Sequence, residues 1–352
     1  MALDGIRGIA AIAVVLFHAR AWISPFYCFL SGYLAVDLFF VLSGFVIAHS
    51  YEKRLLGGLS TKDFLVARMI RLQPLIVIGT VIGLAYPWLN HEISTARDLL
   101  FLAMILVINC LLLPYIFDRE MFPLNFAAWS LFYELAINIL FALVGYRMRN
   151  SVLLIVAVLF LIGLCIAGTI EGDLNQGPWR KDLFAGSMRV GYSFIVGMLA
   201  YRTRLSWSAH IPRVSAWWVL GATALALVPN FVGTPRLLYD LTFALVLSPL
   251  IVVLGAQCTI RTRSVGIFNL LGLLSFPLYA FHIPVKRLFQ VADLPDVNTA
   301  TLACLALGTT FVSALIAGLW VDPIIRRYLT ERYRRFSKDG RRKNLVAIQQ
   351  CS

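Results

Sequence analysis

Long runs of apolar residues, separated by short polar breaks, extend from one end of the chain to the other. Each run is about 16 to 24 residues long, the length that a helix needs to cross a hydrocarbon core of roughly 30 Å. The runs are continuous rather than alternating, so they predict helices and not the strands of a barrel. The eleven candidate spans are 6–22, 29–49, 74–90, 98–117, 126–146, 151–170, 186–201, 214–232, 238–256, 267–289 and 300–321.

The composition agrees with an all-α polytopic membrane protein. Of the 352 residues, 60% are hydrophobic and 14% are charged, a balance that soluble domains do not sustain over this length. The formal net charge of +13 would suggest nucleic-acid binding in a soluble protein. Here the basic residues lie in the breaks between apolar runs, where they set membrane orientation, and no nucleic-acid partner is expected. The six cysteines lack the spacing of a metal site, so no metal is expected.

The lysines and arginines predict which ends of the spans face the cytoplasm. Strongly basic breaks alternate with breaks that hold few basic residues, and the basic set should be cytoplasmic. Both termini are then cytoplasmic, which requires about ten transmembrane helices rather than eleven. The short stretch 74–90, interrupted by glycines and Pro87, is predicted to be re-entrant or tilted. We expect one transmembrane domain, 1–325, and a basic cytoplasmic tail, 326–352, which begins on anionic lipid.

The first apolar stretch contains two ionisable side chains, Arg7 and His18. They are eleven residues apart, so on a helix they share one face and lie roughly 16 Å apart along the axis. Ionisable groups at membrane depth are expensive and usually face a bundle interior or a water-filled cavity. The pair therefore indicates a polar functional site.

Two carboxylates lie inside later spans. Asp37 shares a helix face with Phe40 and Gly44, a pattern that fits both a functional role and a close helix contact in which Asp37 pairs with an arginine. Glu134 shares a face with Ser130, four residues earlier. A buried carboxylate must be paired or protonated, and either state suits proton transfer.

Three arginines lie near the ends of spans. Arg68 and Arg71 are three residues apart in the polar loop before Pro74. They could bind a phosphorylated ligand through charge-assisted hydrogen bonds, or serve only as topology anchors. Arg189 lies three or four residues inside the seventh span, where snorkelling of its side chain to the interface is expected.

A second polar stripe lies near the other end of the chain, where Ser275, Tyr279 and His282 share one helical face. Pro277 and Pro284 would kink or end this helix and free backbone carbonyls. A lone histidine on a membrane helix is often a satisfied interhelical bond. A second intramembrane histidine, accompanied by a tyrosine and a serine, strengthens the case for function.

The expected topology combines these residues into one site. Arg68 and Arg71 lie on the cytoplasmic side, whereas His18, Glu134 and His282 lie in the outer half of the membrane. The arrangement fits a cavity with a phosphate-binding cytoplasmic mouth and an acid–base centre deeper toward the outside.

These residues resemble those of the acyltransferase-3 family of integral membrane O-acyltransferases. The resemblance extends in order through nearly the whole chain: Leu3-Asp4-Gly5-Ile6-Arg7-Gly8 with His18, the block from Asp37 to Gly44, Arg68 with Arg71 and Pro74, Trp129-Ser130-Leu131 with Glu134, Arg189, and Ser275 with Tyr279 and His282. It implies a ten-helix domain that takes an acyl group, usually acetyl from cytoplasmic acetyl-CoA, and delivers it to a hydroxyl of an extracytoplasmic glycan. The Glu-Pro that often closes the family's last helix is Asp322-Pro323 here.

The resemblance also implies roles for single residues. His18, with Arg7, is the expected base or transient acyl carrier, and Arg68 and Arg71 suit the phosphates of the acyl-CoA donor. The other candidates are Glu134 and His282, in orienting or proton-relay catalytic roles, and Asp37, Ser130, Arg189 and Tyr279.

The expected partners are the lipid bilayer, a glycan or other hydroxylated acceptor and the machinery of glycan synthesis, in the inner membrane of a bacterium. A transporter or flippase for a lipid-linked glycan is the alternative, because intramembrane charges also serve as substrate or proton sites. The chain shows no inverted or parallel repeat, which favours the enzyme. A purely structural scaffold would not need so many ionisable groups inside its spans.

Overall fold

The apolar runs fold into a bundle of helices in the computed structural model, which describes residues 2–20, 29–291 and 298–336, without the side chain of residue 234. The described part contains no strand, and the all-α membrane prediction is confirmed. Eight helical units are long and apolar enough to cross a membrane: Ala2–Ala19, Gly32–Leu56, Thr61–Leu89, Asn150–Glu171, Arg180–Arg202, Pro235–Gln257, Thr262–Val291 and Thr299–Phe336. Two shorter apolar helices accompany them, Ala128–Leu143 and Ala216–Ala226.

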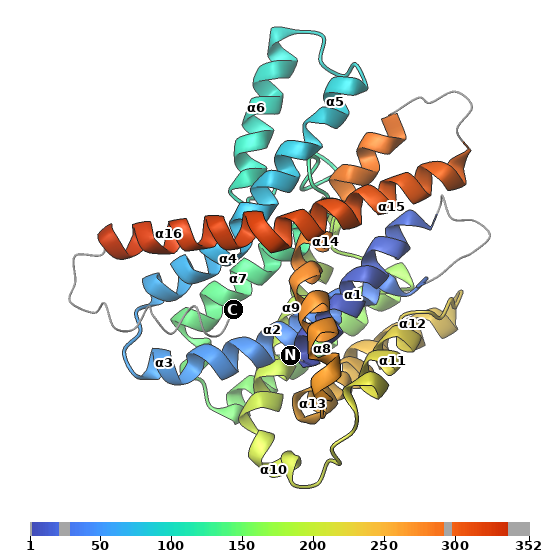
Figure 1. Cartoon of the computed structure of the whole chain (residues 1–352). Coiled ribbons are helices and arrows are strands. Elements are labelled where there is room, and N and C mark those ends of the chain that lie inside the picture. Colours follow the sequence, from blue (N-terminus) through green and yellow to red (C-terminus); the bar gives the residue numbers. More distant parts are fainter. Residues whose placement is uncertain (1, 21–28, 292–297, 337–352) are drawn as a thin grey trace.

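Several of these units consist of more than one helix (Figure 1). In chain order, the α-helices are α1 (Ala2–Ala19), α2 (Ala35–Ile47), α3 (Lys53–Leu56), α4 (Thr61–Gly83), α5 (Ala85–Leu89), α6 (Ala96–Cys110), α7 (Ala128–Leu143), α8 (Asn150–Glu171), α9 (Leu183–Arg202), α10 (Arg204–Ser208), α11 (Ala216–Ala226), α12 (Thr234–Thr242), α13 (Ser248–Gln257), α14 (Val265–Val291), α15 (Thr299–Ile316) and α16 (Asp322–Phe336). Short 3-10 or π segments are η1 (Gly32–Leu34), η2 (Ala48–Glu52), η3 (Gly145–Arg147), η4 (Arg180–Asp182), η5 (Phe243–Leu247), η6 (Thr262–Ser264) and η7 (Ala317–Val321).

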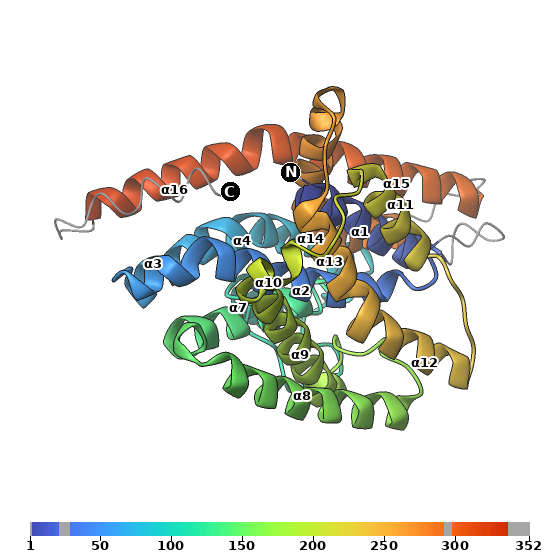
Figure 2. The same cartoon turned by 90° about the horizontal axis from the view of Figure 1, so that it is seen from below.

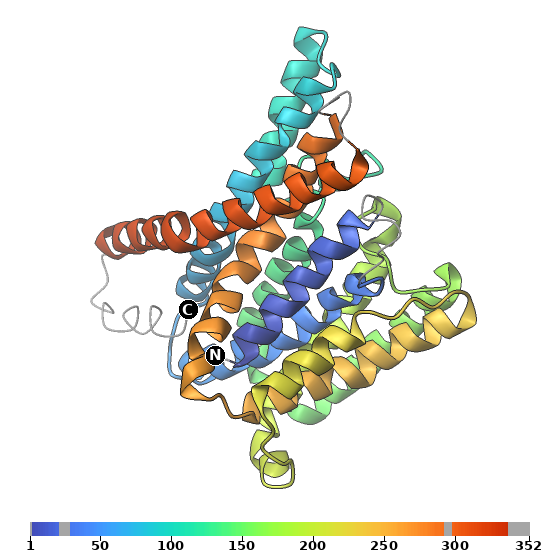
Figure 3. The same ribbon diagram turned by 45° about the vertical axis from the view of Figure 1, so that its right-hand side comes forward.

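Helices α1 and α14 pack side by side in the interior of the bundle (Figure 3). Near the start of both helices, a Cβ at Gly8 would lie 2.6 Å from the backbone oxygen of Leu271, so only glycine permits this approach. Near their other ends, the rings of His18 and His282 are in contact, which shows that the two helices run parallel. Close packing through a small residue is typical of membrane helices. It places the two polar stripes predicted from the sequence against each other.

Helices α2 and α9 also pack closely, as the Gly44 pattern predicted. A Cβ at Gly44 would lie 2.0 Å from the carbonyl oxygen of Phe194, and one at Gly197 would lie 2.1 Å from that of Val41. The backbones of the two helices therefore meet on both sides of the contact.

Replacing Gly44 with alanine is expected to destabilise the protein by about 1–3 kcal/mol, because the added methyl group forces the two backbones apart. Thermal unfolding of the detergent-purified protein measures this loss. Gly221→Ala is the matched control, since a Cβ at Gly221 has no atom within 4 Å. Equal melting temperatures for the two variants would contradict the close contact.

The segment that carries Arg68 and Arg71 is helical, so its prediction as a loop was wrong. Helix α4 begins directly after Ser60, whose hydroxyl accepts a hydrogen bond from the Asp63 amide at 3.0 Å. This N-cap satisfies one of the free amides at the helix start. Pro74 is accommodated inside the helix.

The region that follows is helical as well. The stretch 74–90, expected to be re-entrant or tilted, is the second part of the unit Thr61–Leu89, which is long enough to cross a membrane. Helix α6 occupies the start of the predicted span 98–117, but it has only 15 residues and is not one of the eight units. Together, α5 and α6 form a hairpin that projects beyond the neighbouring helices (Figure 1).

The last described unit is one long helical segment along a side of the bundle, opposite α8 and α9 (Figure 2). The π segment η7 separates α15 from α16. Helix α16 continues without a break past residue 326, where the sequence placed the start of the tail.

Candidate active site

A cavity of about 660 Å³ is lined by residues of α1, α2, α4, α7, α14 and α16. Its charged lining consists of five arginines and three carboxylates: Arg7, Arg68, Arg71, Arg326, Arg327, Asp4, Glu134 and Asp322. Positive charges therefore outnumber negative ones. Such a lining suits a ligand with several negative charges, because clefts with walls of low dielectric focus the field of the charges that line them.

Arg68 and Glu134 form an ion pair in this lining. The Arg68 Nη2 lies 2.7 Å from Glu134 Oε1, and the Ser43 hydroxyl donates to the same oxygen at 3.1 Å. Both side chains are mostly buried, with exposed fractions of 7% and 18%. Glu134 therefore fixes an arginine of the cavity. The structure does not bring Glu134 to the histidines, where the sequence grouped it.

The other two predicted arginines of this cavity differ in their partners. Arg7 Nη1 donates to Asp4 Oδ1 at 3.3 Å, one turn earlier on α1. The Arg71 guanidinium makes no hydrogen bond or ion pair within the described residues. An arginine that lines a cavity with its donor groups unpaired is available to bind an anion.

His18 and His282 form a pair, with ring centroids 5.0 Å apart. Each ring donates its Nδ1–H to a backbone carbonyl of its own helix, His18 to Val14 at 2.9 Å and His282 to Tyr279 at 2.9 Å. In a neutral imidazole, this bond leaves Nε2 as the acceptor. The Nε2 of His282 is buried and has no hydrogen-bond partner among the described residues. Both rings are therefore in the tautomer that a base or a nucleophile needs.

Tyr279 connects the cavity to this pair of histidines. Its hydroxyl lies 2.6 Å from the Ser130 hydroxyl, and both residues line the cavity. Its ring centroid lies 5.6 Å from that of His282. The two histidines are not among the lining residues in the described part of the chain. Tyr279 thus lies between the charged cavity and the imidazoles.

Helix α14 continues through both prolines, and a residue that the sequence analysis missed supports this. Pro284 has no N–H to donate to the carbonyl of Ala280, four residues earlier. The Asn125 amide donates to that carbonyl instead, at 3.1 Å. Asn125 comes from the segment before α7, and nothing in its local pattern marks it.

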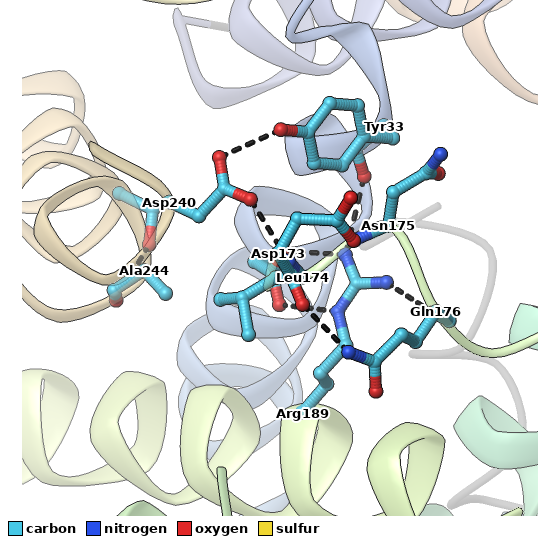
Figure 4. A network of polar contacts seen from close by, with 10 residues as sticks. Tyr33, Asp173, Leu174, Asn175, Gln176, Arg189, Asp240 and Ala244 are labelled. Atoms are coloured by element: carbon cyan, nitrogen blue, oxygen red, sulfur yellow. Dashed lines mark hydrogen bonds and ion pairs between the residues drawn. The ribbon is translucent and has the colours of Figure 1, made fainter. Parts of the chain in front are cut away.

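Asp37 and Arg189 form a bidentate ion pair away from the cavity. The Arg189 Nη2 and Nε lie 2.6 and 3.1 Å from the two Asp37 oxygens. Arg189 is only 1% exposed, so the expectation that it snorkels to the interface was wrong. It also donates to the backbone carbonyls of Tyr33 and Gln176 (Figure 4).

A hydrogen-bond network extends from this ion pair to α12. The Tyr33 hydroxyl donates to Asp240 at 2.7 Å, and the other Asp240 oxygen accepts from the Leu174 amide at 2.8 Å (Figure 4). The network thereby joins η1, α9 and α12 to the segment that follows α8. Its position away from the cavity indicates that Asp37 and Arg189 support the bundle.

Comparisons with known proteins identify what the chain is similar to. A family model described as an acyltransferase domain matches residues 2–318. A protein named protein 2 in the picA locus, from Rhizobium radiobacter, is 40% identical over 168 residues, which are 44% of this chain and 87% of the relative. The peptidoglycan O-acetyltransferase OatA of Listeria monocytogenes is 33% identical over 94 residues, which are 25% of this chain and 14% of the relative. No solved structure matches the chain.

Proposed function

The chain belongs to the acyltransferase-3 family, and on this premise we propose that it transfers an acyl group, most simply acetyl, from cytoplasmic acyl-CoA to a hydroxyl of an extracytoplasmic or lipid-linked glycan. It is an integral membrane acyltransferase. The proposed donor and acceptor draw on the resemblance and on the O-acetyltransferase relative. The proposed cellular location of the protein is the inner membrane of a bacterium.

One observation carries the proposal: a positively charged cavity is joined through Tyr279 to a pair of histidines. Coenzyme A carries several phosphate charges, which match the excess of arginines over carboxylates. Its thioester already stores the driving force, so the reaction needs no nucleotide hydrolysis. What the protein must supply is a way to hold the donor and a base for the acceptor.

We assign the role of the base to the histidines. In the direct route, His18 Nε2 takes the proton of the acceptor hydroxyl while the hydroxyl oxygen attacks the thioester carbonyl. The sulfur leaves as the coenzyme A thiolate, which is then protonated. In the two-step route, Nε2 attacks the thioester carbonyl and expels the coenzyme A thiolate, which leaves the acyl group on the imidazole. The acceptor oxygen then attacks this acyl group and displaces the imidazole, while the acceptor proton passes through His282 to the thiolate. Both routes end with an ester on the acceptor and free coenzyme A. His282 orients His18 or relays the proton.

The composition of the cell-envelope glycans tests the proposal. We expect mass spectrometry of glycans from a deletion strain to show loss of acyl esters that the parent strain carries. Wild-type protein expressed in the deletion strain should restore them, and the His18→Ala variant should not. Identical acylation in the parent and deletion strains would contradict the proposed activity.

A further inference from the structure

Helix α16 follows the part of the chain that the family model matches, which ends at residue 318. It nevertheless contributes to the cavity described above. Asp322, Arg326 and Arg327 all line that cavity. A charged segment near the end of a membrane protein is ordinarily read as a solvated tail, but these three side chains face the same space as Arg68 and Arg71.

Helix α16 crosses α4 (Figure 1), and two hydrogen bonds hold it there. Arg326 Nη2 donates to the backbone carbonyl of Arg71 at 3.2 Å. Two turns further on, the Tyr333 hydroxyl donates to Asp63 at 2.9 Å. The π segment η7 lies at the start of α16, and such segments are frequent at functional sites. The helix is therefore docked on α4 directly beside the arginines of the cavity.

The Arg326 side chain is held with one donor group free. Its Nε lies 2.8 Å from Asp322 Oδ1 and its Nη2 lies 2.7 Å from Asp322 Oδ2. Nη1 makes no hydrogen bond within the described residues. The side chain is 24% exposed, so it is accessible from the cavity without being fully solvated. Asp322 thus orients the planar guanidinium as a positioning residue.

Arg326 and Arg71 are neighbours that both keep guanidinium donor groups free within the described residues. Arg68 and Arg71 are close enough to act electrostatically on Arg326. Arg68 is already paired with Glu134. The Arg71 guanidinium makes no ion pair within the described residues, although Asp4 and Asp322 are close enough to act on it electrostatically. Two guanidinium groups with free donors, held beside each other at a cavity, favour a phosphate, because planar guanidinium groups match its oxygens.

We propose that α16 completes the donor site, and that Arg326 acts with Arg71 to bind phosphate groups of the nucleotide end of coenzyme A. This inference rests on the proposed function, which makes the cavity the donor site. It extends that site beyond the residues that the family model covers.

Binding of coenzyme A to the purified full-length protein in lipid nanodiscs, measured by isothermal titration calorimetry, tests the inference. We expect Arg326→Gln to weaken binding about tenfold or more, the loss expected for a hydrogen-bonded charge pair. Arg335→Gln is the matched control, because Arg335 is an exposed arginine of the same helix that does not line the cavity. It should bind as the wild type does.

A third variant distinguishes a loss of binding from a folding defect. Arg326→Lys keeps the charge but loses the planar geometry, so we expect a melting temperature near that of the wild type and binding weakened about threefold. Wild-type affinity in both Arg326 variants would overturn the inference while leaving the proposed function intact. Failure of the wild type itself to bind coenzyme A would instead overturn the proposed donor, and the inference with it.

Discussion

Replacing His18 with alanine is expected to lower the rate of acyl transfer at least about a hundredfold, because general-base catalysis contributes that much or more. In the wild type, Nδ1 of His18 donates its hydrogen to the Val14 carbonyl, so Nε2 is unprotonated. The variant loses this Nε2. It keeps the ion pairs of the cavity, so donor binding should change little. Release of the free thiol from acetyl-CoA, in membranes that contain the natural acceptor, measures the rate.

The matched control for this variant is His49→Ala. His49 is an exposed histidine of η2, its ring lies against Tyr201, and it does not line the cavity. Its loss should leave the transfer rate unchanged. Near-normal turnover by the His18 variant would remove His18 from the chemistry and would leave His282 as the candidate base.

A second large effect is expected at the buried ion pair. Replacing Asp37 with asparagine leaves the Arg189 guanidinium charged and without its carboxylate, at a site where Asp37 is 0% and Arg189 is 1% exposed. Breaking a buried pair in this way costs about 3–5 kcal/mol, a large share of the stability of a typical protein. We expect a much lower melting temperature and poor recovery of the purified variant.

The double variant Asp37→Leu with Arg189→Met provides the comparison. It removes both charges, so it should recover part of the stability that the single change loses. A wild-type melting temperature for Asp37→Asn, together with lost acyl transfer, would show that Asp37 serves catalysis rather than the fold.

Features that repeat along one helix could be predicted from the sequence. The spacing of Arg7 and His18, and that of Ser275, Tyr279 and His282, identified polar faces because helical periodicity alone determines which residues share a face. The contact between His18 and His282 could not be derived in this way. It depends on how α1 and α14 pack, and therefore on residues such as Gly8 that carry no chemistry.

Two errors, at Arg189 and at the segment of Arg68 and Arg71, have a common physical origin in the surroundings of a charged residue. Arg189 lies close to a polar break, but the segment after α8 and the start of α2 cover it and provide its partners. Arg68 and Arg71 lie in a polar stretch. This stretch is part of the helix that starts after Ser60, whose side chain caps its first turn. Arg326 lies in a basic segment, and it reaches the cavity lining only because α16 packs on α4. A charged residue in an apolar stretch indicates a free-energy cost of burial. The partners that offset this cost come from tertiary contacts, which the sequence does not show.

We propose that an acyl group enters from the cavity side of the membrane and is delivered through the histidines to the other side. The most direct test uses sealed membrane vesicles of both orientations, prepared from cells that express the protein. Acetyl-labelled coenzyme A is added to the outside of the vesicles. We predict that inside-out vesicles incorporate the label into ester-linked glycan, and that right-side-out vesicles and inside-out vesicles with His18→Ala do not. Equal labelling of both orientations, or labelling that does not depend on His18, would contradict the account.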